Sequence, residues 1–349
     1  MGLRSLLKEI TQKDGVSGFE QELAKTISQH FASLVDDTRT DNLGNLIMLK
    51  KGSKGFPRVI LCAHMDEIGL IVTKMEKGGF LRFTSLGGFD VRTLPGQKVT
   101  VYGRETFEGI IGFNPPHLQT SQERNKSPQM DTLFIDTGLP EEEVEKSIPI
   151  GSVAAIQRSF LDLMHQTSAG KAFDDRAGVA VLWQCAGELN KLVHEADVYL
   201  VATVQEEVGV RGAVVSAYGL SPDLGVAVDV CHGSIPGAKE HEVSELGKGP
   251  VVTAGPNIHP GIAERLAAVA KDYHLPCQRD VSPGPTGTDA RAIQVSMEGI
   301  PTGLLSIPLR YMHTSVELVD LDDVKLSGRL LAYFTAGLDQ TMVEELSCL

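Results

Sequence analysis

Residues 198–209 read Val198-Tyr199-Leu200-Val201-Ala202-Thr203-Val204-Gln205-Glu206-Glu207-Val208-Gly209, and this segment organises the rest of the chain. An apolar run rich in β-branched residues leads into two adjacent carboxylates, which predicts a buried parallel strand with acid at its carboxyl end. Ligands of open α/β sheets bind at that end of the strands. Successive side chains of an extended segment point to opposite sides, so one glutamate can hold a cation while its neighbour stays free as a base. An isolated Glu-Glu pair is more often a solvated strand end, and the remaining sequence decides between these interpretations.

Composition places the chain among ordinary globular proteins. It has 349 residues, of which 42% are hydrophobic and 22% charged, enough for about two domains with a large core. The formal net charge is −13 and no cluster of lysine and arginine is present, which argues against nucleic acid as a partner. Residues 1–13 predict a short amphipathic helix without a signal pattern, and no apolar run is long enough to span a bilayer. Export and membrane insertion are therefore not expected.

The cysteines are scattered and form no Cys-x-x-Cys pair. They stand at five positions, Cys62, Cys185, Cys231, Cys277 and Cys348. The odd number and wide spacing predict reduced thiols and not a disulfide framework. Reduced thiols are typical of cytoplasmic proteins, so the cytoplasm is the location we expect.

Helical and extended patterns alternate on both sides of a long β-rich segment. Strands are predicted at residues 45–50, 58–63, 198–204, 224–230 and 302–307. Helices are predicted at residues 18–34, 212–218 and 261–273, and another helix is predicted to end near residue 189. The last predicted helix covers residues 321–337. Between the two halves, residues 68–163 read as short strands separated by Gly, Pro and Asn, with a polar loop at 119–130 that we expect to be mobile. The predicted fold class is therefore α/β, a mixed sheet flanked by helices. A catalytic domain of residues 1–67 and 164–349 would carry an inserted all-β barrel of residues 68–163.

Two imidazoles and three carboxylates fall at predicted strand ends or in the loops beside them. These residues are His64, Asp174, Glu207, Asp229 and His313. Such a set suits two divalent ions of borderline hardness. One bridging carboxylate would hold the ions about 3.5 to 4 Å apart, a separation that clamps a water or hydroxide and polarises a carbonyl. Glu206 would then be free to take the proton from that water and pass it to a leaving amine.

Each of these signals is weak alone. The His-x-Asp motif from His64 to Asp66 can be a ligand with its supporting acid, because a ligating imidazole usually needs an acceptor on its other nitrogen. A structural histidine is the more frequent outcome, and we interpret His117, after two prolines, in that way. The sequence has no Gly-x-Ser-x-Gly elbow and no Gly-x-x-x-x-Gly-Lys phosphate loop to suggest a different chemistry.

Six blocks, in order and over nearly the whole length, strongly resemble the tetrahedral (TET) aminopeptidases, a family of glutamyl, leucyl and deblocking aminopeptidases. They include Ala63-His64-Met65-Asp66-Glu67-Ile68-Gly69 and Gln205-Glu206-Glu207-Val208-Gly209-Val210-Arg211-Gly212-Ala213, and the others cover residues 170–178, 228–229, 287–290 and 310–317. The resemblance implies a zinc-exopeptidase-like fold with the inserted barrel. It also implies a two-metal aminopeptidase that removes the first residue of short peptides with a free N-terminus.

The resemblance assigns ligands by motif position. Asp174 would bridge the two ions, His64 and Asp229 would complete one site, and Glu207 and His313 the other. The ions would be Zn²⁺ or Co²⁺ first, with Mn²⁺ or Ni²⁺ also compatible with N and O ligands.

Further implications concern the base and the assembly. Glu206 would be the general base, and Asp66 would orient His64. A cis peptide bond between Asp174 and Asp175 is frequent in relatives. The inserted barrel mediates dimer formation in the family, and six dimers commonly build a hollow dodecamer, so we expect a homo-oligomer.

The residue preferred at the peptide N-terminus stays open. Residues 283–287 read Pro-Gly-Pro-Thr-Gly, with a proline where many relatives have glycine, and this loop is expected to border the pocket for the first side chain. Residues 231–238 and 304–310 are the expected pocket walls, and Arg310 could face either the substrate or the interior.

Three other functions would use part of the same residue set. A two-zinc carboxypeptidase, dipeptidase or deacylase uses a similar ligand set, but its added domain follows the counterpart of Asp229, whereas the β-rich segment here lies between His64 and Asp174. A glycosidase using Glu206 would need a second acid across a sugar and no metal. A non-catalytic assembly protein would not need a free base beside five ligands.

Overall fold

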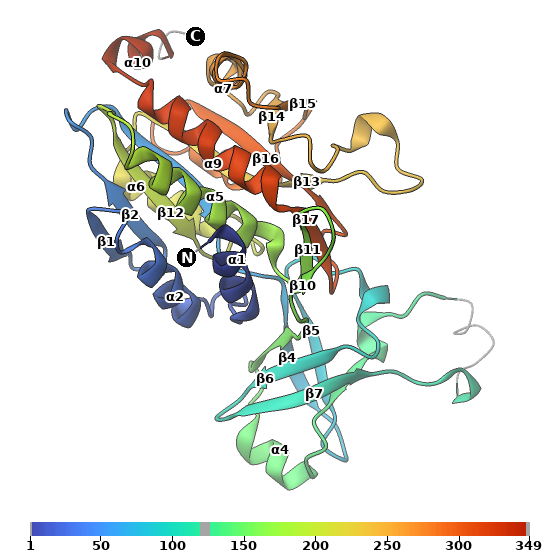
Figure 1. The fold of residues 1–349 in the computed structure, drawn as a ribbon. Helices are drawn as coiled ribbons and strands as arrows, with labels where there is room; N and C mark the ends of the chain where they lie inside the picture. Colours follow the sequence, from blue (N-terminus) through green and yellow to red (C-terminus); the bar gives the residue numbers. More distant parts are fainter. Residues whose placement is uncertain (1, 119–125, 347–349) are drawn as a thin grey trace.

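The computed structural model describes residues 2–118 and 126–346, which form a larger body of helices around a sheet and a smaller β body beside it (Figure 1). The predicted fold class is confirmed: a mixed sheet flanked by helices and a closed antiparallel barrel. The predicted loop at 119–130 lies in part outside the described residues.

The large sheet has eleven strands within the described part of the chain. Nine follow one path in the order β1 (Asp37–Thr40), β2 (Leu46–Lys50), β12 (Asp197–Thr203), β3 (Arg58–His64), β13 (Leu224–His232), β16 (Thr302–Arg310), β17 (Glu317–Asp320), β11 (Thr167–Gly170) and β10 (Leu161–Asp162). Two more extend it from β16, namely β14 (Val251–Ala254) and β15 (Gln278–Val281). The central strands β12, β3, β13 and β16 are parallel and almost wholly buried, as continuous apolar runs predict.

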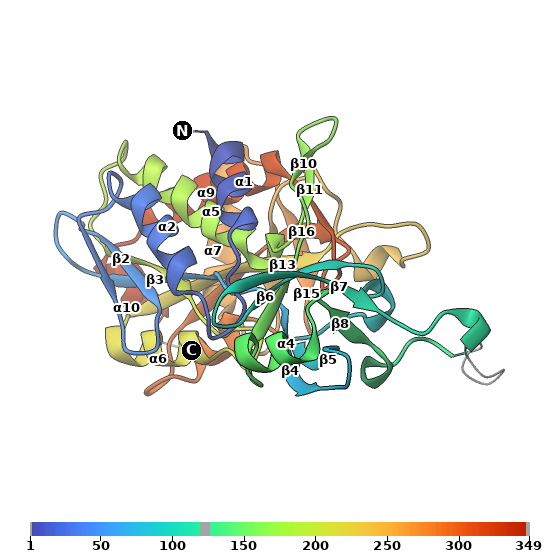
Figure 2. The same cartoon turned by 90° about the horizontal axis from the view of Figure 1, so that it is seen from below.

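Helices cover both faces of this sheet. They are α1 (Leu3–Gln12), α2 (Gln21–Phe31), α5 (Phe173–Leu189), α6 (Arg211–Leu220), α7 (Pro260–Asp272), α8 (Asp289–Gln294), α9 (Leu321–Ala336) and α10 (Gln340–Leu346). Figure 2 shows α1, α2 and α5 on one side of the sheet and α6 on the other. The prediction that the helix at 321–337 is the last one is wrong, because α10 follows it.

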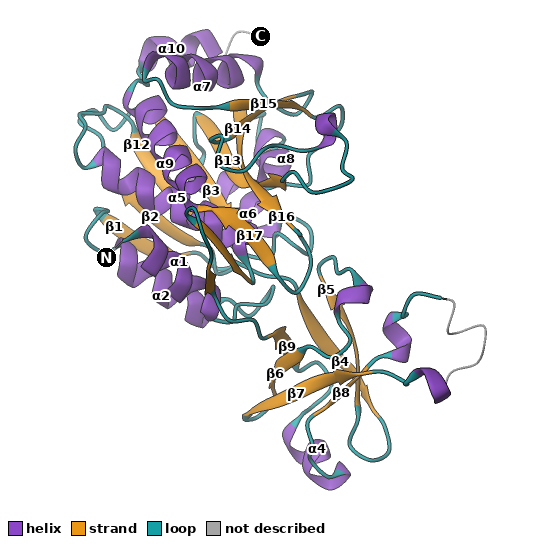
Figure 3. Cartoon of the chain, turned by 45° about the vertical axis from the view of Figure 1, so that its right-hand side comes forward, coloured by secondary structure: helices purple, strands orange, loops and turns teal. Residues whose placement is uncertain are grey.

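The smaller body is a closed barrel of six short strands within the described residues. Its order is β4 (Gly69–Met75), β5 (Leu81–Leu86), β8 (Phe134–Asp136), β7 (Thr106–Gly112), β6 (Lys98–Tyr102) and β9 (Val153–Ile156), with α4 (Glu141–Ser147) alongside. Short 3-10 turns lie at Val91–Thr93, Pro116–Leu118, Met130–Thr132 and Glu240–Glu242. The barrel has its own hydrophobic cluster, separate from that of the large body, and Figure 3 shows it standing clear of the helices that cover the large sheet. The exact domain limits stay a prediction; β10, inside the predicted insert, pairs with the large sheet.

A buried charge cluster links the barrel to the large body. The Lys171 ammonium contacts Asp14 and lies 3.0 Å from Glu67, two carboxylates of the larger body. From the barrel side, Gln157 donates to the same Asp14 at 2.9 Å and the Tyr102 hydroxyl also donates to it. Lys171 is three residues before Asp174, so this cluster fixes the chain that leads into the predicted site.

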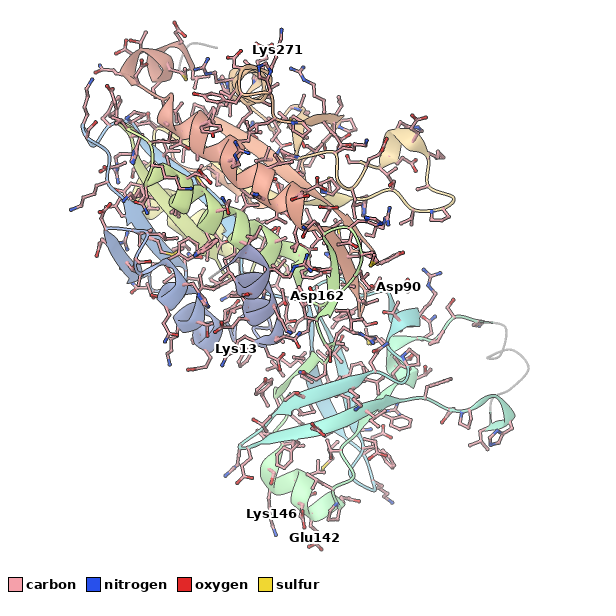
Figure 4. All side chains as sticks on the ribbon, viewed as in Figure 1. Lys13, Asp90, Glu142, Lys146, Asp162 and Lys271 are labelled. Atoms are coloured by element: carbon pink, nitrogen blue, oxygen red, sulfur yellow. The ribbon has the colours of Figure 1, made fainter. Side chains whose placement is uncertain are left out.

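No helix among the described residues is long and apolar enough to cross a membrane. Four of the five cysteines are described, and all four are free thiols. Cys348 lies outside the described residues. Charged side chains such as Glu142 and Lys146 on α4 and Lys271 on α7 project from the surface (Figure 4).

Candidate metal centre and substrate cavity

The parallel register brings the predicted residues together. Thr203 at the end of β12 lies opposite His64 at the end of β3, so Glu206 and Glu207, just beyond β12, reach the edge where His64 stands. Asp229 is near the end of β13, the other neighbour of β3. Asp174 enters from the kinked start of α5, and His313 from the loop after β16. Five separate segments thus converge at the carboxyl edge of the sheet.

Asp174 lies between the two imidazoles. Its Oδ1 is 3.1 Å from Nε2 of His64, and its Oδ2 is 3.2 Å from Nε2 of His313. Glu207 Oε1 is 3.5 Å from the same His313 nitrogen. Each oxygen of one carboxylate therefore faces a different histidine, which is the arrangement that a bridging carboxylate needs. The peptide bond between Asp174 and Asp175 is cis.

Two triads offer ligand atoms within 4.8 Å of one another. One is His64, Asp174 and Glu207, and the other is His64, Asp175 and Asp229. Asp175 was not predicted to be near a metal. Its Oδ1 accepts the N–H of Gly178 at 3.0 Å and its Oδ2 the N–H of His64 at 3.3 Å, so its oxygens already support the backbone of the site.

The Glu206 carboxylate stands at the same centre without an imidazole at hydrogen-bonding distance. Its Oε2 is 3.9 Å from Nε2 of His64, and the residue is buried. Its side chain is therefore close enough to act on a group bound between the two histidines. It makes no hydrogen bond to the His64 ring.

The second ring nitrogen of His64 is fixed by the backbone. Nδ1 lies 3.1 Å from the carbonyl oxygen of Asp66, so Nδ1 carries the proton and donates to that carbonyl. Nε2, which lies 3.1 Å from Asp174 Oδ1, is then the nitrogen whose lone pair becomes available when a metal ion displaces its proton. The remaining Nδ1–H tautomer is the one that a metal-ligating histidine requires.

The carboxylate of Asp66 supports the two glutamates more closely than the histidine. It accepts the N–H of Glu206 at 3.0 Å, the N–H of Glu207 at 3.3 Å and the hydroxyl of Ser17 at 2.6 Å. Its nearest approach to His64 Nδ1 is 3.6 Å. Asp66 is fully buried, so these donors are the source of its stabilisation.

Other supporting residues escaped the sequence analysis. Glu20 accepts the N–H of Gln205, whose φ of +55° is a strained value for a residue with a side chain, at 3.1 Å. Glu317 accepts the N–H of Asp174 at 3.1 Å, and Asp289 accepts the hydroxyl of Thr203 at 2.6 Å. Glu317 and Asp289 lie inside the motif blocks, and this position was the sequence signal that could have identified them as supporting residues. Glu20 and Ser17 precede all of the blocks, so no motif in the sequence pointed to them.

The electrostatics of the cluster favour bound cations. Burial raises the pKa of Glu206 to about 9 and that of Asp229 to about 8, and nearby carboxylates reinforce both shifts. Burial and then Asp174 raise the pKa of Glu207 well above its usual value. Burial opposes a charge on His64, but Asp174, Glu206 and Asp66 outweigh it and raise the pKa of His64. Carboxylates packed this closely ionise together only when positive charge is placed among them.

The donor set fits divalent metal ions on these grounds. It combines imidazole nitrogens with carboxylate oxygens, the ligands that zinc, cobalt and manganese accept. The buried like charges favour the binding of cations, and the hydrogen bond from His64 Nδ1 to the Asp66 carbonyl leaves Nε2 as the nitrogen that can ligate. The described residues therefore include a set of candidate metal ligands.

The centre opens into a cavity of about 640 Å³. Its lining includes His64, Asp174, Glu206, Glu207, Asp229 and His313 together with residues of the loop at 285–288. From the expected walls, Cys231, His232, Leu304 and Ser306 line it. Arg310 does not, because its Nε donates to the carbonyl oxygen of Ser234 at 2.6 Å. His117 is exposed in the turn Pro116–Leu118 and does not line the cavity either.

Comparisons with known proteins agree with the motif blocks. The sequence profile of M42 glutamyl aminopeptidases matches residues 44–330. The lysyl aminopeptidase of Pyrococcus furiosus is 39% identical over 335 residues, which cover 93% of this chain and 96% of that protein. The aminopeptidase APDkam598 of the archaeon Desulfurococcus kamchatkensis has a similar structure, with a TM-score of 0.93, 38% identity and coverage of 99% of this chain and 98% of that one.

A second similar structure is that of the TET1 peptidase of Pyrococcus horikoshii, which can assemble into a tetrahedron or a large octahedral shell. It has a TM-score of 0.85 and 31% identity, and the match covers 97% of this chain and 100% of that one. The resemblance to the TET aminopeptidases is thereby confirmed. The profile match spans most of the chain, and all three of these similar proteins exceed 30% identity over nearly its full length. This chain therefore belongs to the M42 glutamyl aminopeptidase family and is a peptide hydrolase.

Proposed function

We propose that this chain removes the N-terminal residue of short peptides with the help of two divalent metal ions, Zn²⁺ or Co²⁺ before Mn²⁺ or Ni²⁺. The observation that carries the proposal is the position of Asp174, whose two carboxylate oxygens face the Nε2 atoms of His64 and His313. Asp174 is assigned as the bridging ligand, His64 and Asp229 as ligands of one ion, and Glu207 and His313 as ligands of the other.

Glu206 is assigned as the general base. When bound, the two ions supply Lewis acidity to a peptide carbonyl and acidify a water. Positive charge in the centre also favours the ionised form of Glu206, whose carboxylate takes the proton from the attacking water. As the water oxygen bonds to the carbonyl carbon and the C–N bond breaks, Glu206 returns that proton to the leaving amine. Asp66 holds the backbone of Glu206 and Glu207 and, through its carbonyl, the ring of His64.

Substrates and metals are tested together on aminoacyl-p-nitroanilides. The purified protein is assayed on unblocked substrates and on their N-acetylated counterparts, after chelation and after return of zinc, cobalt or manganese. We expect activity only with metal and only on free N-termini. Activity on the acetylated series would contradict the aminopeptidase assignment, and full activity after chelation with verified metal removal would contradict the metal assignment.

We further propose a homo-oligomer in which the barrel mediates dimer formation and dimers build a dodecamer. The barrel has a hollowed face lined by Val99, Ile110 and Phe134, and Ile110 is 52% exposed. Apolar surface of this kind is common at subunit contacts, and the similar peptidase from Pyrococcus horikoshii assembles into shells. Light scattering during gel filtration tests the assembly; a monomer at micromolar concentration would contradict it. A cytoplasmic location is proposed from the free thiols.

A further inference from the structure

One face of the large sheet runs from the candidate metal centre to an exposed carboxylate on the outermost strand. Asp229 of β13 lies opposite Ser306 of β16, and Ser306 lies opposite Val251 of β14. Two residues beyond Val251, Thr253 lies opposite Asp280 of β15. Paired residues, and residues two apart on one strand, share a face of a sheet. Asp229, Ser306, Thr253 and Asp280 accordingly all line the cavity, and Figure 3 shows these four strands adjacent.

Asp280 is the unpaired charge of this wall. Its side chain is exposed, and within the described parts of the chain no ion pair or hydrogen bond engages its carboxylate. The other acid on the cavity wall outside the metal centre, Glu242, is already paired with Lys239 at 2.8 Å. On the sheet face itself, the cavity residues Thr253 and Cys231 carry no charge. A cation entering the cavity along this face therefore meets a carboxylate that has no ion-pair partner among the described side chains.

The spacing suits a long side chain. Strands lie about 4.8 Å apart, so the backbones of Asp229 and Asp280 are about 14 to 16 Å apart across three strand spacings and one two-residue step. The side chains of Asp229 and Asp280 stand roughly perpendicular to the same face of the sheet, so this lateral gap stays open between them. The side chain of a lysine advances about 6 Å over its five bonds, and a hydrogen bond at its end adds about 3 Å. A leucine side chain ends about 4 Å short of that reach and leaves Asp280 in contact with water.

We propose that Asp280 makes this enzyme select peptides whose first residue carries a cationic side chain, lysine or arginine. The proposal rests on the aminopeptidase function proposed above, because it needs the first residue to lie between the metal centre and β15. The opposite charge in the cavity, Arg291, belongs to α8 and follows the loop at 285–288, so it is not part of the face that ends at Asp280. If Arg291 set the preference instead, glutamate would be the favoured first residue.

The test compares kcat/KM for the p-nitroanilides of lysine, arginine, leucine and glutamate. It uses the metal-loaded wild type, Asp280→Asn, Arg291→Gln and, as a matched surface control, Glu142→Gln at the far end of the barrel (Figure 4). We expect the wild type to prefer lysine and arginine, and Asp280→Asn to lose about 3- to 10-fold on these two while leucine changes less than twofold. The preference should also shrink at high salt, because the pair is open to solvent. Glu142→Gln should match the wild type on all four substrates.

The opposite pattern would overturn the proposal. A wild type that cleaves leucine or glutamate faster than lysine contradicts it, as does an Asp280→Asn variant that keeps the cationic preference. A preference for glutamate that disappears in Arg291→Gln would place the selecting charge on α8. Retained leucine hydrolysis reports that the variant is folded and loaded with metal. Failure of all four substrates in the wild type would instead contradict the aminopeptidase function itself.

Discussion

The side-chain carboxylate of Asp66 accepts the backbone N–H of Glu206 at 3.0 Å. The same carboxylate accepts the N–H of Glu207 at 3.3 Å, whereas its distance to His64 Nδ1 is 3.6 Å. The histidine is held instead by the backbone carbonyl of Asp66. One residue therefore positions the proposed base and two proposed ligands, but it does so through two different groups.

Asp66→Ala should lower kcat about 10- to 100-fold, because it removes the acceptor that fixes both glutamates while leaving the carbonyl on His64 in place. Ser17→Ala removes one of the three hydrogen bonds to the same carboxylate and should cost much less. Steady-state kinetics and metal analysis measure the loss of positioning. A thermal melt of the same variant shows whether the fold is retained. Wild-type kcat in folded Asp66→Ala would contradict the assignment.

His313→Ala should remove one ion and spare the other, because His313 faces Asp174 and Glu207 but not the second triad around Asp229. Metal analysis by mass spectrometry should show occupancy falling from about two toward one per chain. His117→Ala, an exposed histidine outside the cavity, is the matched control and should keep both ions. Unchanged stoichiometry in His313→Ala would argue against its role as a ligand.

Lys171→Met should destabilise the fold by about 3 kcal/mol, because it leaves the partly buried carboxylate of Asp14 without its cation, whereas Glu67 keeps the Arg176 guanidinium at 3.0 Å. Denaturant unfolding of the metal-free protein measures this loss. Lys191→Met, whose ion pair with Glu188 is on the surface, should change stability by less than about 1 kcal/mol. Equal effects of the two substitutions would show that the cluster between barrel and sheet contributes little.

The same cluster predicts a pH dependence of stability. Burial alone would raise the pKa of Asp14, but the Lys171 ammonium outweighs burial and holds that pKa below its usual value. A carboxyl whose folded pKa is lowered binds fewer protons when folded, so it stabilises the fold above its unfolded pKa of about 3.9 and loses this contribution as pH falls further. Below about pH 4, stability should therefore fall less steeply in Asp14→Asn than in the wild type. If the free energy of unfolding fell equally steeply below pH 4 in Asp14→Asn and in the wild type, this prediction would be contradicted.

Much of the fold was predictable because local patterns and tertiary packing agree. The continuous apolar run at 198–204 predicts a central parallel strand, and β12 is that strand with a boundary one residue away at each end. The short alternating runs after residue 68 predict the barrel in the same way. The helix α10 escaped prediction because a seven-residue helix carries too little periodicity to separate from a loop.

The site was predictable only in its motif residues. Proposed ligands such as His64 and Glu207 stand in recognisable blocks at strand ends, where α/β topology collects them. Residues that hold the backbone, such as Ser17 and Glu20, carry no chemical signature in sequence, because any acceptor placed there by the fold would serve. The double contribution of Asp66 likewise depends on a turn whose geometry the sequence does not specify.

The most direct test of which residues bind metal and which residue acts as the base is Glu206→Gln. Metal content and peptide hydrolysis are measured on the same preparation of this variant. Glutamine keeps the size of the side chain but cannot accept the proton. We predict both ions bound as in the wild type and a fall in kcat of about 10²- to 10⁴-fold. Near-normal turnover with full metal occupancy would contradict the assignment of Glu206 as the base, and loss of one ion would make it a ligand instead.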